Sequence, residues 1–138
     1  MIEFTIPGEP VGKARPRVAQ GHAYTPQKTR DYEERVRWCW KAIAKGAPPL
    51  EGPVSVTIDA LHRVPKSASK ALLQSIYAGQ VVPMKKPDPD NVAKIILDAL
   101  NGLAYLDDKQ VIRLSVNKAY DLFEAGCVIV RVEEAPHA

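Results

Sequence analysis

The chain has 138 residues, of which 46% are hydrophobic and 25% charged, a composition typical of one globular domain. A chain of this length buries enough surface to fold without disulfide or metal staples, and it is too short for an eightfold βα barrel. No apolar run reaches the ~18 residues of a membrane helix, and the first ten residues lack the basic region of a secretory signal. We therefore expect a single domain over residues 1–138, located in the cytoplasm.

The spacing of cysteine and histidine argues against a disulfide or a zinc site. Cys39 and Cys127 belong to no CxxC pair, so we interpret both as reduced packing residues. His22, His62 and His137 form no HxxH or HxxxH pair. This pattern disfavours the class of zinc hydrolases.

Basic residues are concentrated in the N-terminal third. Residues 12–45 hold nine lysines and arginines against three acidic residues, a balance of +6, although the whole chain carries only +3. Within this region, residues 12–30 contain five basic side chains and no acid. Such asymmetry is typical of a surface that binds a polyanion. A solvated loop decorated with lysine and arginine would carry the same charges, so both interpretations stay open at this point.

Apolar periodicity predicts seven elements in the order β-α-β-α-α-β-β. In chain order they are a strand over residues 2–6, a helix from a Thr25-Pro26 cap to Gly46, a strand over 54–62, a short helix within 67–79, a helix from Val92 to Gly102, and a C-terminal strand pair over 111–120 and 126–132. A polar loop over residues 9–24 lacks periodicity, and loops this long are usually functional or mobile. We expect a mixed α+β fold, in which the helices pack on one mixed β-sheet.

Two predicted helices have an apolar stripe that should face the core. The first stripe consists of Tyr32, Val36, Cys39, Trp40, Ile43 and Ala44, and the second of Val92, Ile95, Ile96, Ala99, Leu100 and Leu103. Trp40 lies at helical spacing and is expected in the core. For Trp38, core packing and base stacking both remain open.

Two aspartates, Asp88 and Asp90, stand among prolines just before the second of these helices. Proline biases the preceding residue toward extended backbone, and in an extended segment side chains two positions apart point the same way. The two carboxylates would then share one space and repel each other unless a cation neutralises them. A hard divalent ion such as Mg²⁺, which binds carboxylate, water and phosphate oxygens, is the natural solution.

Lys94 lies one helical turn beyond Asp90 on the same side, where an ammonium could hold a phosphate, orient a water or stabilise developing negative charge. A structural explanation is also open, with Asp90 as the helix N-cap and Lys94 as its i,i+4 ion-pair partner. Asp107-Asp108 is best interpreted as a plain turn, and Asp98 is expected to be a solvated helical residue.

Acids that hold a metal, a nearby lysine and a cationic surface are together the parts of a metal-dependent nuclease. The spacing does not fit the PD-(D/E)xK nucleases, whose second acid stands two residues before the lysine. A DxD sugar-nucleotide site is disfavoured, because the chain is too short for the nucleotide-binding domain that usually carries it.

The run DPDNVAK at residues 88–94, with LDAL at 97–100 and LDDKQV at 106–111, closely resembles the RusA-type Holliday junction resolvases. These are crossover junction endodeoxyribonucleases with a D-x-D-N-x-x-K signature, a helix ending near D-A-L, and an L-D-D turn before a strand. The stretch GKARPR at 12–17, with Tyr24-Thr25-Pro26, is similar to the phage and prophage branch. The chain departs from the family in having Pro87 where other members have arginine, with Lys85-Lys86 just upstream.

This resemblance implies a homodimer that binds four-way DNA junctions and cuts two strands symmetrically, using Mg²⁺ or Mn²⁺, in DNA recombination and repair. It implies that Asp88, Asp90 and Asp108 are catalytic and bind the metal, that Lys94 is the essential lysine, and that Asp107 falls outside the site. The residues expected to contact the DNA backbone are Lys13, Arg15, Arg17, Lys28, Arg30, Lys85 and Lys86. Two alternatives stay open: a non-catalytic module that binds branched DNA, and a nuclease that acts on flaps or forks.

Overall fold

The structure is a computed structural model that describes residues 1–123 and 125–136, so His137 lies outside the described residues. Four strands form a mixed sheet in the order β1-β6-β4-β5, and two more form a small separate sheet. The strands are β1 (Ile2–Pro7), β2 (Arg17–Ala19), β3 (His22–Tyr24), β4 (Val54–Arg63), β5 (Val111–Asp121) and β6 (Cys127–Glu134). The helices are α1 (Gln27–Ala44), α2 (Lys70–Tyr77) and α3 (Pro89–Leu100), with a 3₁₀ turn, η1, at Asp108–Gln110. The predicted α+β fold with one mixed main sheet is confirmed.

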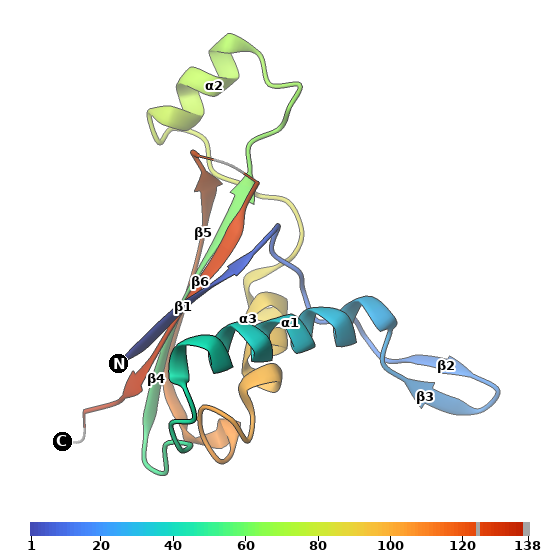
Figure 1. Cartoon of the computed structure of the whole chain (residues 1–138). Coiled ribbons are helices and arrows are strands. Elements are labelled where there is room, and N and C mark those ends of the chain that lie inside the picture. The colour runs from blue at the N-terminus through green and yellow to red at the C-terminus, as the bar shows by residue number, and fades with distance from the viewer. Residues whose placement is uncertain (124, 137–138) are drawn as a thin grey trace.

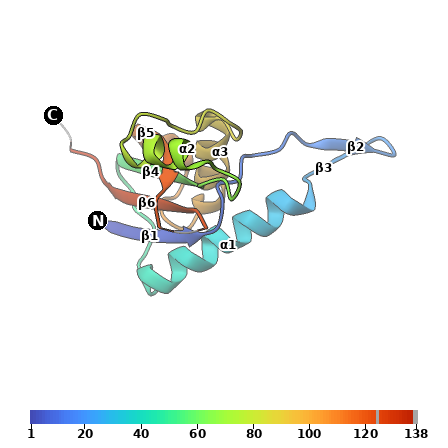
Figure 2. The same ribbon diagram turned by 90° about the horizontal axis from the view of Figure 1, so that it is seen from above.

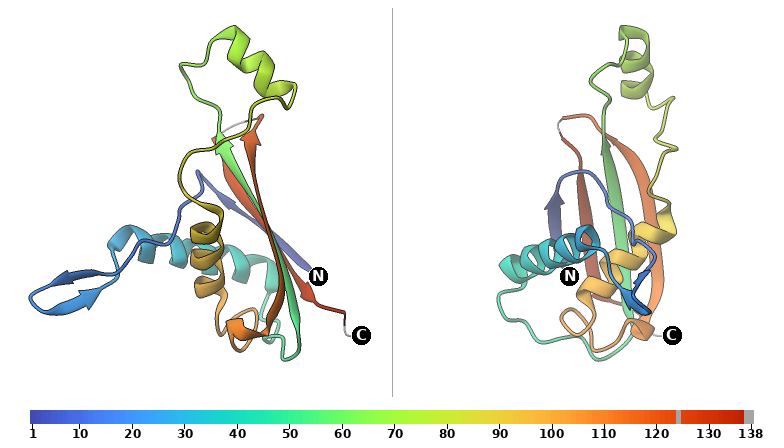
Figure 3. Two further views of the ribbon diagram at one scale, coloured as in Figure 1. Left: turned by 180° about the vertical axis from the view of Figure 1, so that it is seen from behind. Right: turned by 90° about the vertical axis from the view of Figure 1, so that its right-hand side faces the viewer.

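Helices α1 and α3 pack on one face of the sheet, α1 against β1 and α3 against β5, and they also contact each other (Figure 1). Helix α2 stands beyond one end of the sheet (Figure 1). The β2–β3 hairpin extends away from the sheet on the far side of α1 and α3, as Figures 2 and 3 show from three further directions. No helix in the described residues is long and apolar enough to cross a membrane.

Strands β5 and β6 are not neighbours, so the predicted C-terminal strand pair is wrong as a pairing. Strand β4 lies between them, parallel to β5 and antiparallel to β6. The chain therefore crosses the end of β4 on its way from β5 to β6. Gly126 marks the crossing: its φ is +93°, and a Cβ there would lie 3.0 Å from the Leu61 carbonyl oxygen. Only glycine combines this backbone conformation with so close an approach.

The core lies between the helices and the covered face of the sheet. Val54, Val56, Ile58 and Ala60 alternate along β4 with half-exposed residues and are fully buried. The predicted stripe of α3 is confirmed, with Leu103 only partly buried. Every residue of that stripe within α3 is buried, namely Val92, Ile95, Ile96, Ala99 and Leu100.

Helix α1 buries Tyr32, Val36 and Trp40, and the Trp40 ring meets Phe4 of β1 edge to face at 5.7 Å between centroids. Ile43 is an exception, because it is exposed despite its helical spacing. Trp38 is 69% exposed, which answers the open question of its placement in favour of the surface. The predicted cap is also wrong: Pro26 itself is the N-cap, and no side chain caps the helix. Its carbonyl instead accepts from the N–H groups of Thr29 and Arg30.

Cys39 and Cys127 are free thiols, as expected. Burial raises the pKa of both thiols, partly offset at Cys39 by the positive charge of Arg35. Both side chains therefore stay protonated near neutral pH and serve as packing groups.

The loop predicted over residues 9–24 contains the β2–β3 hairpin. Its turn residues Gln20 and Gly21 both have positive φ, 52° and 78°, the combination of a two-residue type I′ turn. This turn matches the right-handed twist of paired strands, which is why so short a hairpin forms here. The preceding residues, 9–14, run across the start of α3, and we call them the N-terminal strap.

Candidate functional site

Asp88 and Asp90 lie where helix α3 begins. Asp88 is its N-cap with extended backbone, Pro89 is its first residue, and Asp90 lies in its first turn. The Asp88 side chain makes no capping hydrogen bond, and both aspartates are exposed. The hypotheses that Asp90 caps the helix and that both acids share one extended segment are therefore wrong. The partial positive charge of the helix N-terminus attracts both carboxylates.

Lys94 lies one turn further along α3 with an exposed side chain. No ion pair joins it to Asp90 in the part of the chain that the structure describes. The i,i+4 ion pair is thus not the explanation of this spacing.

In the Asp107-Asp108 turn, Asp107 has a structural role as the cap of η1. Asp107 caps η1 by accepting from the Lys109 N–H at 2.9 Å, while the Gln110 side chain accepts from the Asp107 N–H at 2.8 Å. The hydrogen bond from Lys109 is the main cause of the lowered pKa of Asp107. Asp108 is different: its pKa is raised by partial burial, then by the adjacent Asp107 and by the charge of Asp98.

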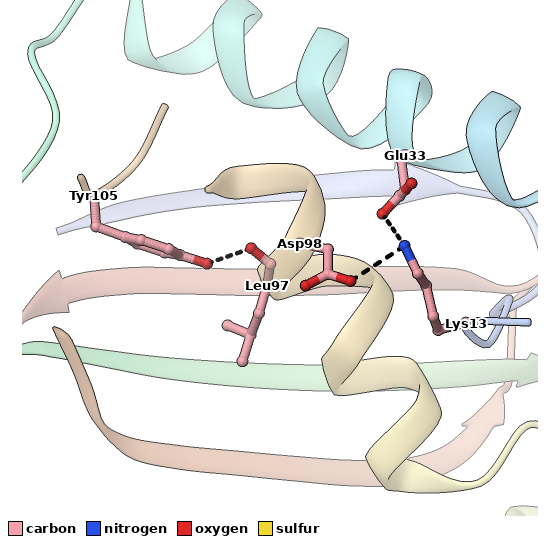
Figure 4. A network of polar contacts seen from close by, with 5 residues as sticks. All are labelled: Lys13, Glu33, Leu97, Asp98 and Tyr105. Carbon is pink, nitrogen blue, oxygen red and sulfur yellow. Dashed lines mark hydrogen bonds and ion pairs between the residues drawn. The ribbon is translucent and has the colours of Figure 1, made fainter. Parts of the chain in front are cut away.

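Asp98 is not the solvated residue that was expected. Its carboxylate lies 3.1 Å from the ammonium of Lys13, which also donates to Glu33 of α1 at 2.9 Å (Figure 4). Burial works to lower the pKa of Lys13, but its hydrogen bonds to the two acids outweigh burial and raise it. Lys13 was expected at the DNA backbone. In the structure its charge is already neutralised by two carboxylates, and it ties the strap to α1 and α3.

The N-terminal strap is fixed at both ends and in the middle. The Glu9 carboxylate accepts from the Arg63 N–H at 2.8 Å, and the Lys13 N–H donates to the Asn91 carbonyl at 3.0 Å. Between these points Gly12 lies so close to α3 that an added Cβ would be 2.7 Å from the Pro87 Cβ. These positioning residues were missed by the sequence analysis, because their partners are distant along the chain.

A groove of about 700 Å³ runs between the strap, the start of α1 and the start of α3. Asp88 lines it, together with basic side chains from three separate segments: Arg17, Lys28 and Lys86. Of the other residues expected at DNA, Lys13 lines the groove in its paired state, whereas Arg15, Arg30 and Lys85 are not part of its lining. The structure therefore gathers Asp88 and three cations around a single depression that Glu9 also lines, and none of these cations forms an ion pair within the described residues.

His62 is fully buried at the end of β4, and neither ring nitrogen has a hydrogen-bond partner among the described residues. Its Nδ1 lies 3.4 Å from a Glu9 carboxylate oxygen. Burial lowers the pKa of His62, and the charges of Lys118 and Lys85 lower it further, against the opposing effect of Glu9. The ring is thus neutral near pH 7 and packs beneath the strap.

The three acids that the resemblance groups together come from two elements. Asp88 and Asp90 lie at the start of α3, whereas Asp108 lies in η1, and the charge of Asp98 on α3 contributes to the raised pKa of Asp108. Among the described residues no three His, Cys, Asp or Glu side chains gather closely enough to hold a metal ion. Asp88 and Asp90 alone still fit a hard cation, since Mg²⁺ is often held by one or two carboxylates together with water and phosphate.

An exposed carboxylate pair beside a cationic groove defines a protein that can bring a metal and a phosphodiester together. Comparison with known families agrees: the model described as "Endodeoxyribonuclease RusA" matches residues 7–133. The chain belongs to the RusA endodeoxyribonuclease family, as its motifs indicated, and it is thereby assigned to the DNA endonucleases.

A relative from Bacillus subtilis (strain 168) is 38% identical over 128 residues, covering 86% of this chain and 87% of its own length. It carries the name "Uncharacterized protein YqaN". The match therefore extends over most of both chains.

Proposed function

We propose that the chain is a Mg²⁺-dependent, structure-selective endodeoxyribonuclease that resolves four-way DNA junctions by symmetric hydrolysis of two phosphodiester bonds, in recombination and repair. Mn²⁺ should substitute for Mg²⁺, because both ions bind oxygen ligands in octahedral geometry. Membership in the RusA family supports the nuclease activity. The junction substrate and the metal are the parts that require a test.

The observation that carries this proposal is the position of Asp88 in a groove with Arg17, Lys28 and Lys86. The three cations come from the hairpin, α1 and the segment before α3, so a phosphate backbone in the groove would be held from several sides. Such contacts predict binding that weakens steeply with salt and discriminates little between sequences.

The reaction would be divided among residues at the start of α3. Asp88 and Asp90 would hold the metal, which when bound lowers the pKa of a coordinated water and polarises the scissile phosphodiester. Lys94, one turn away, would hold a phosphate oxygen and offset the negative charge that develops during hydrolysis. Asp108 is proposed as the third catalytic aspartate on the resemblance alone.

Two symmetric cuts require two sites, which we propose come from a twofold dimer. The edge strand β5 exposes Ile112 and Leu114, and Leu106 is exposed just before it. Exposed apolar patches of this kind often mark interfaces. Sedimentation should therefore give a mass of about twice the 15.2 kDa of one chain.

The decisive experiment incubates the purified chain with a synthetic four-way junction and, separately, with linear duplex of the same sequence, each with and without Mg²⁺. We expect paired cuts in the junction only, and only with the metal. Asp90→Asn should abolish them. Asp31→Asn is the matched control, because Asp31 is an exposed acid of α1 whose hydrogen bond within the described residues is to the side chain of Gln27.

Three results would contradict the proposal. Cutting that survives in Asp90→Asn would exclude the metal-ligand role. Equal cutting of linear duplex, or preferred cutting of flaps or forks, would exclude junction specificity. Junction binding without any cutting, unaffected by loss of the acids, would indicate a non-catalytic binding module.

A further inference from the structure

The β2–β3 hairpin is the most exposed ordered segment of the described chain. All six of its strand residues are exposed, and it reaches out beyond the start of α1 without covering any part of the core (Figures 1 and 3). A hairpin of this length is marginal by itself and contributes no burial to the fold. Because the hairpin does not cover the core, we consider a role in binding for its exposed side chains.

The strand register divides the hairpin into two different faces. Arg17 pairs with Tyr24 and Ala19 with His22, so these four side chains share one face. Val18 and Ala23 form the other. One face thus places a guanidinium directly opposite a phenol ring, and Tyr24 is 47% exposed although nothing in the fold requires a tyrosine there.

The Arg17–Tyr24 face is continuous with the groove that contains Asp88, because Arg17 also lines that groove. The chain around the hairpin is strongly cationic: residues 12–30 contain no acid. A polyanion in the groove would therefore meet the hairpin next, and charge complementarity selects nucleic acid as the occupant of this face.

We propose that the Arg17–Tyr24 face of the β2–β3 hairpin binds an unpaired or unstacked base at the branch point of the DNA, with the Tyr24 ring stacked on the base and Arg17 on its phosphate. An aromatic ring can stack only where a base face is accessible. In linear duplex the base faces are covered by their neighbours, whereas a branch point interrupts the stack. The inference rests on the proposed function and adds a means by which branched DNA is distinguished from duplex.

The test measures dissociation constants without divalent metal, so that no cutting occurs, for a four-way junction and for linear duplex over a range of salt concentrations. Tyr24→Ala should weaken junction binding by about 5- to 150-fold, the range for one stacked base. It should leave duplex binding and the salt dependence unchanged. Tyr24→Phe, which keeps the ring, should bind the junction like the wild type.

Two further variants separate stacking from charge and from general effects. Arg17→Gln should weaken binding to both DNAs and reduce the slope of log K against log salt by about one. Tyr77→Ala is the matched control and should change nothing, since Tyr77 is an exposed tyrosine of α2, which lies beyond the end of the sheet and away from the hairpin (Figure 1). Because Tyr24 is outside the core, its substitution should not move the melting temperature.

The outcomes distinguish this inference from the proposed function. If the wild type binds junction and duplex equally, the junction substrate itself is wrong. If the wild type prefers the junction and Tyr24→Ala binds it unchanged, the stacking role is refuted. An equal loss on both DNAs would indicate that the hairpin lies in a duplex groove, and a loss of dimer mass in Tyr24→Ala would indicate that it contacts a second copy; either result overturns the inference.

Discussion

Replacing Lys13 with methionine would remove one charge from the contact between the strap, α1 and α3, while keeping an unbranched side chain of similar length. The Lys13 ammonium lies 2.9 Å from Glu33 and 3.1 Å from Asp98, and only 19% of its side chain is exposed. The substitution leaves the two carboxylates close together without a cation between them. We expect a substantial loss of stability.

The magnitude follows from the burial of the partners. A pair of unit charges 4 Å apart attracts by about 1 kcal/mol in water and about 4 kcal/mol near a protein surface. Removing one partner of a fully buried pair costs about 3–5 kcal/mol. Glu33 is nearly buried, but Asp98 is one-third exposed and screened by water, so we expect about 2–3 kcal/mol. For a chain of this size that corresponds to a melting temperature lower by roughly 8 °C.

Urea unfolding at pH 7 measures the effect, and a mutant cycle assigns it. In the background of Glu33→Gln with Asp98→Asn, the same Lys13→Met substitution should cost little, because no uncompensated carboxylate remains. A loss below about 0.5 kcal/mol in the wild-type background, the size of an ordinary surface substitution, would refute the reasoning. An equal loss in both backgrounds would refute it as well, since the cost would then arise from packing.

Three further predictions concern the same region. Gly12→Ala places a Cβ 2.7 Å from the Pro87 Cβ and should cost about 1–3 kcal/mol in urea unfolding by displacing the strap; unchanged stability would mean that the strap is loosely attached. The pKa of His62 is lowered in the folded state. The free energy of unfolding is therefore highest, as far as His62 is concerned, above the unfolded-state pKa of about 6.5, and it decreases as pH falls below that value, because the unfolded chain then binds a proton that the folded chain does not. Urea midpoints between pH 8 and 5 should decline less in His62→Gln than in the wild type, and parallel curves would contradict this. Asp108→Asn should raise the melting temperature of the metal-free protein at pH 7, because burial and neighbouring acids disfavour the Asp108 carboxylate, while it abolishes cutting; a lower melting temperature would argue against this electrostatic origin.

Local patterns predicted most of the elements correctly, because each rests on a period that the sequence shows directly. The alternation along β4 and the stripe of α3 are of this kind. The order of the strands cannot be predicted in this way, since contacts between distant segments decide which strands are neighbours in a sheet. Strands joined by a short connection usually pair. Here β4 lies between β5 and β6, and Gly126 allows the connection to pass close to the end of β4.

The hairpin was missed although a local signal existed. Gly21 stands between the short segments Arg17–Ala19 and His22–Tyr24, and a glycine at the second turn position is one feature of a two-residue hairpin turn. The segments are only three residues long and face solvent, so they lack the apolar alternation on which strand prediction depends.

The catalytic roles assigned to the site residues stay predictions, but their placement can be compared with the structure. Asp88 and Asp90 lie at the start of α3, and Lys94 lies one turn beyond Asp90. The ion pairs of Lys13 could not be predicted from charge alone, because its partners Glu33 and Asp98 are 20 and 85 positions away in the sequence. A lysine in a basic segment has the same sequence signature whether it faces solvent or closes a contact between two helices.

Strand β6 comes last in the sequence but lies inside the sheet, paired with both β1 and β4. During synthesis β1 therefore has no partner until residues 127–134 have left the ribosome, and the Gly8 N–H likewise waits for the Gly126 carbonyl. The strap follows β1 directly, so the pairing of β1 with β6 fixes the end from which the strap enters the groove. A chain truncated before residue 127 would keep every acidic and basic residue assigned to DNA cutting and still lack the strand that joins β1 to the rest of the sheet.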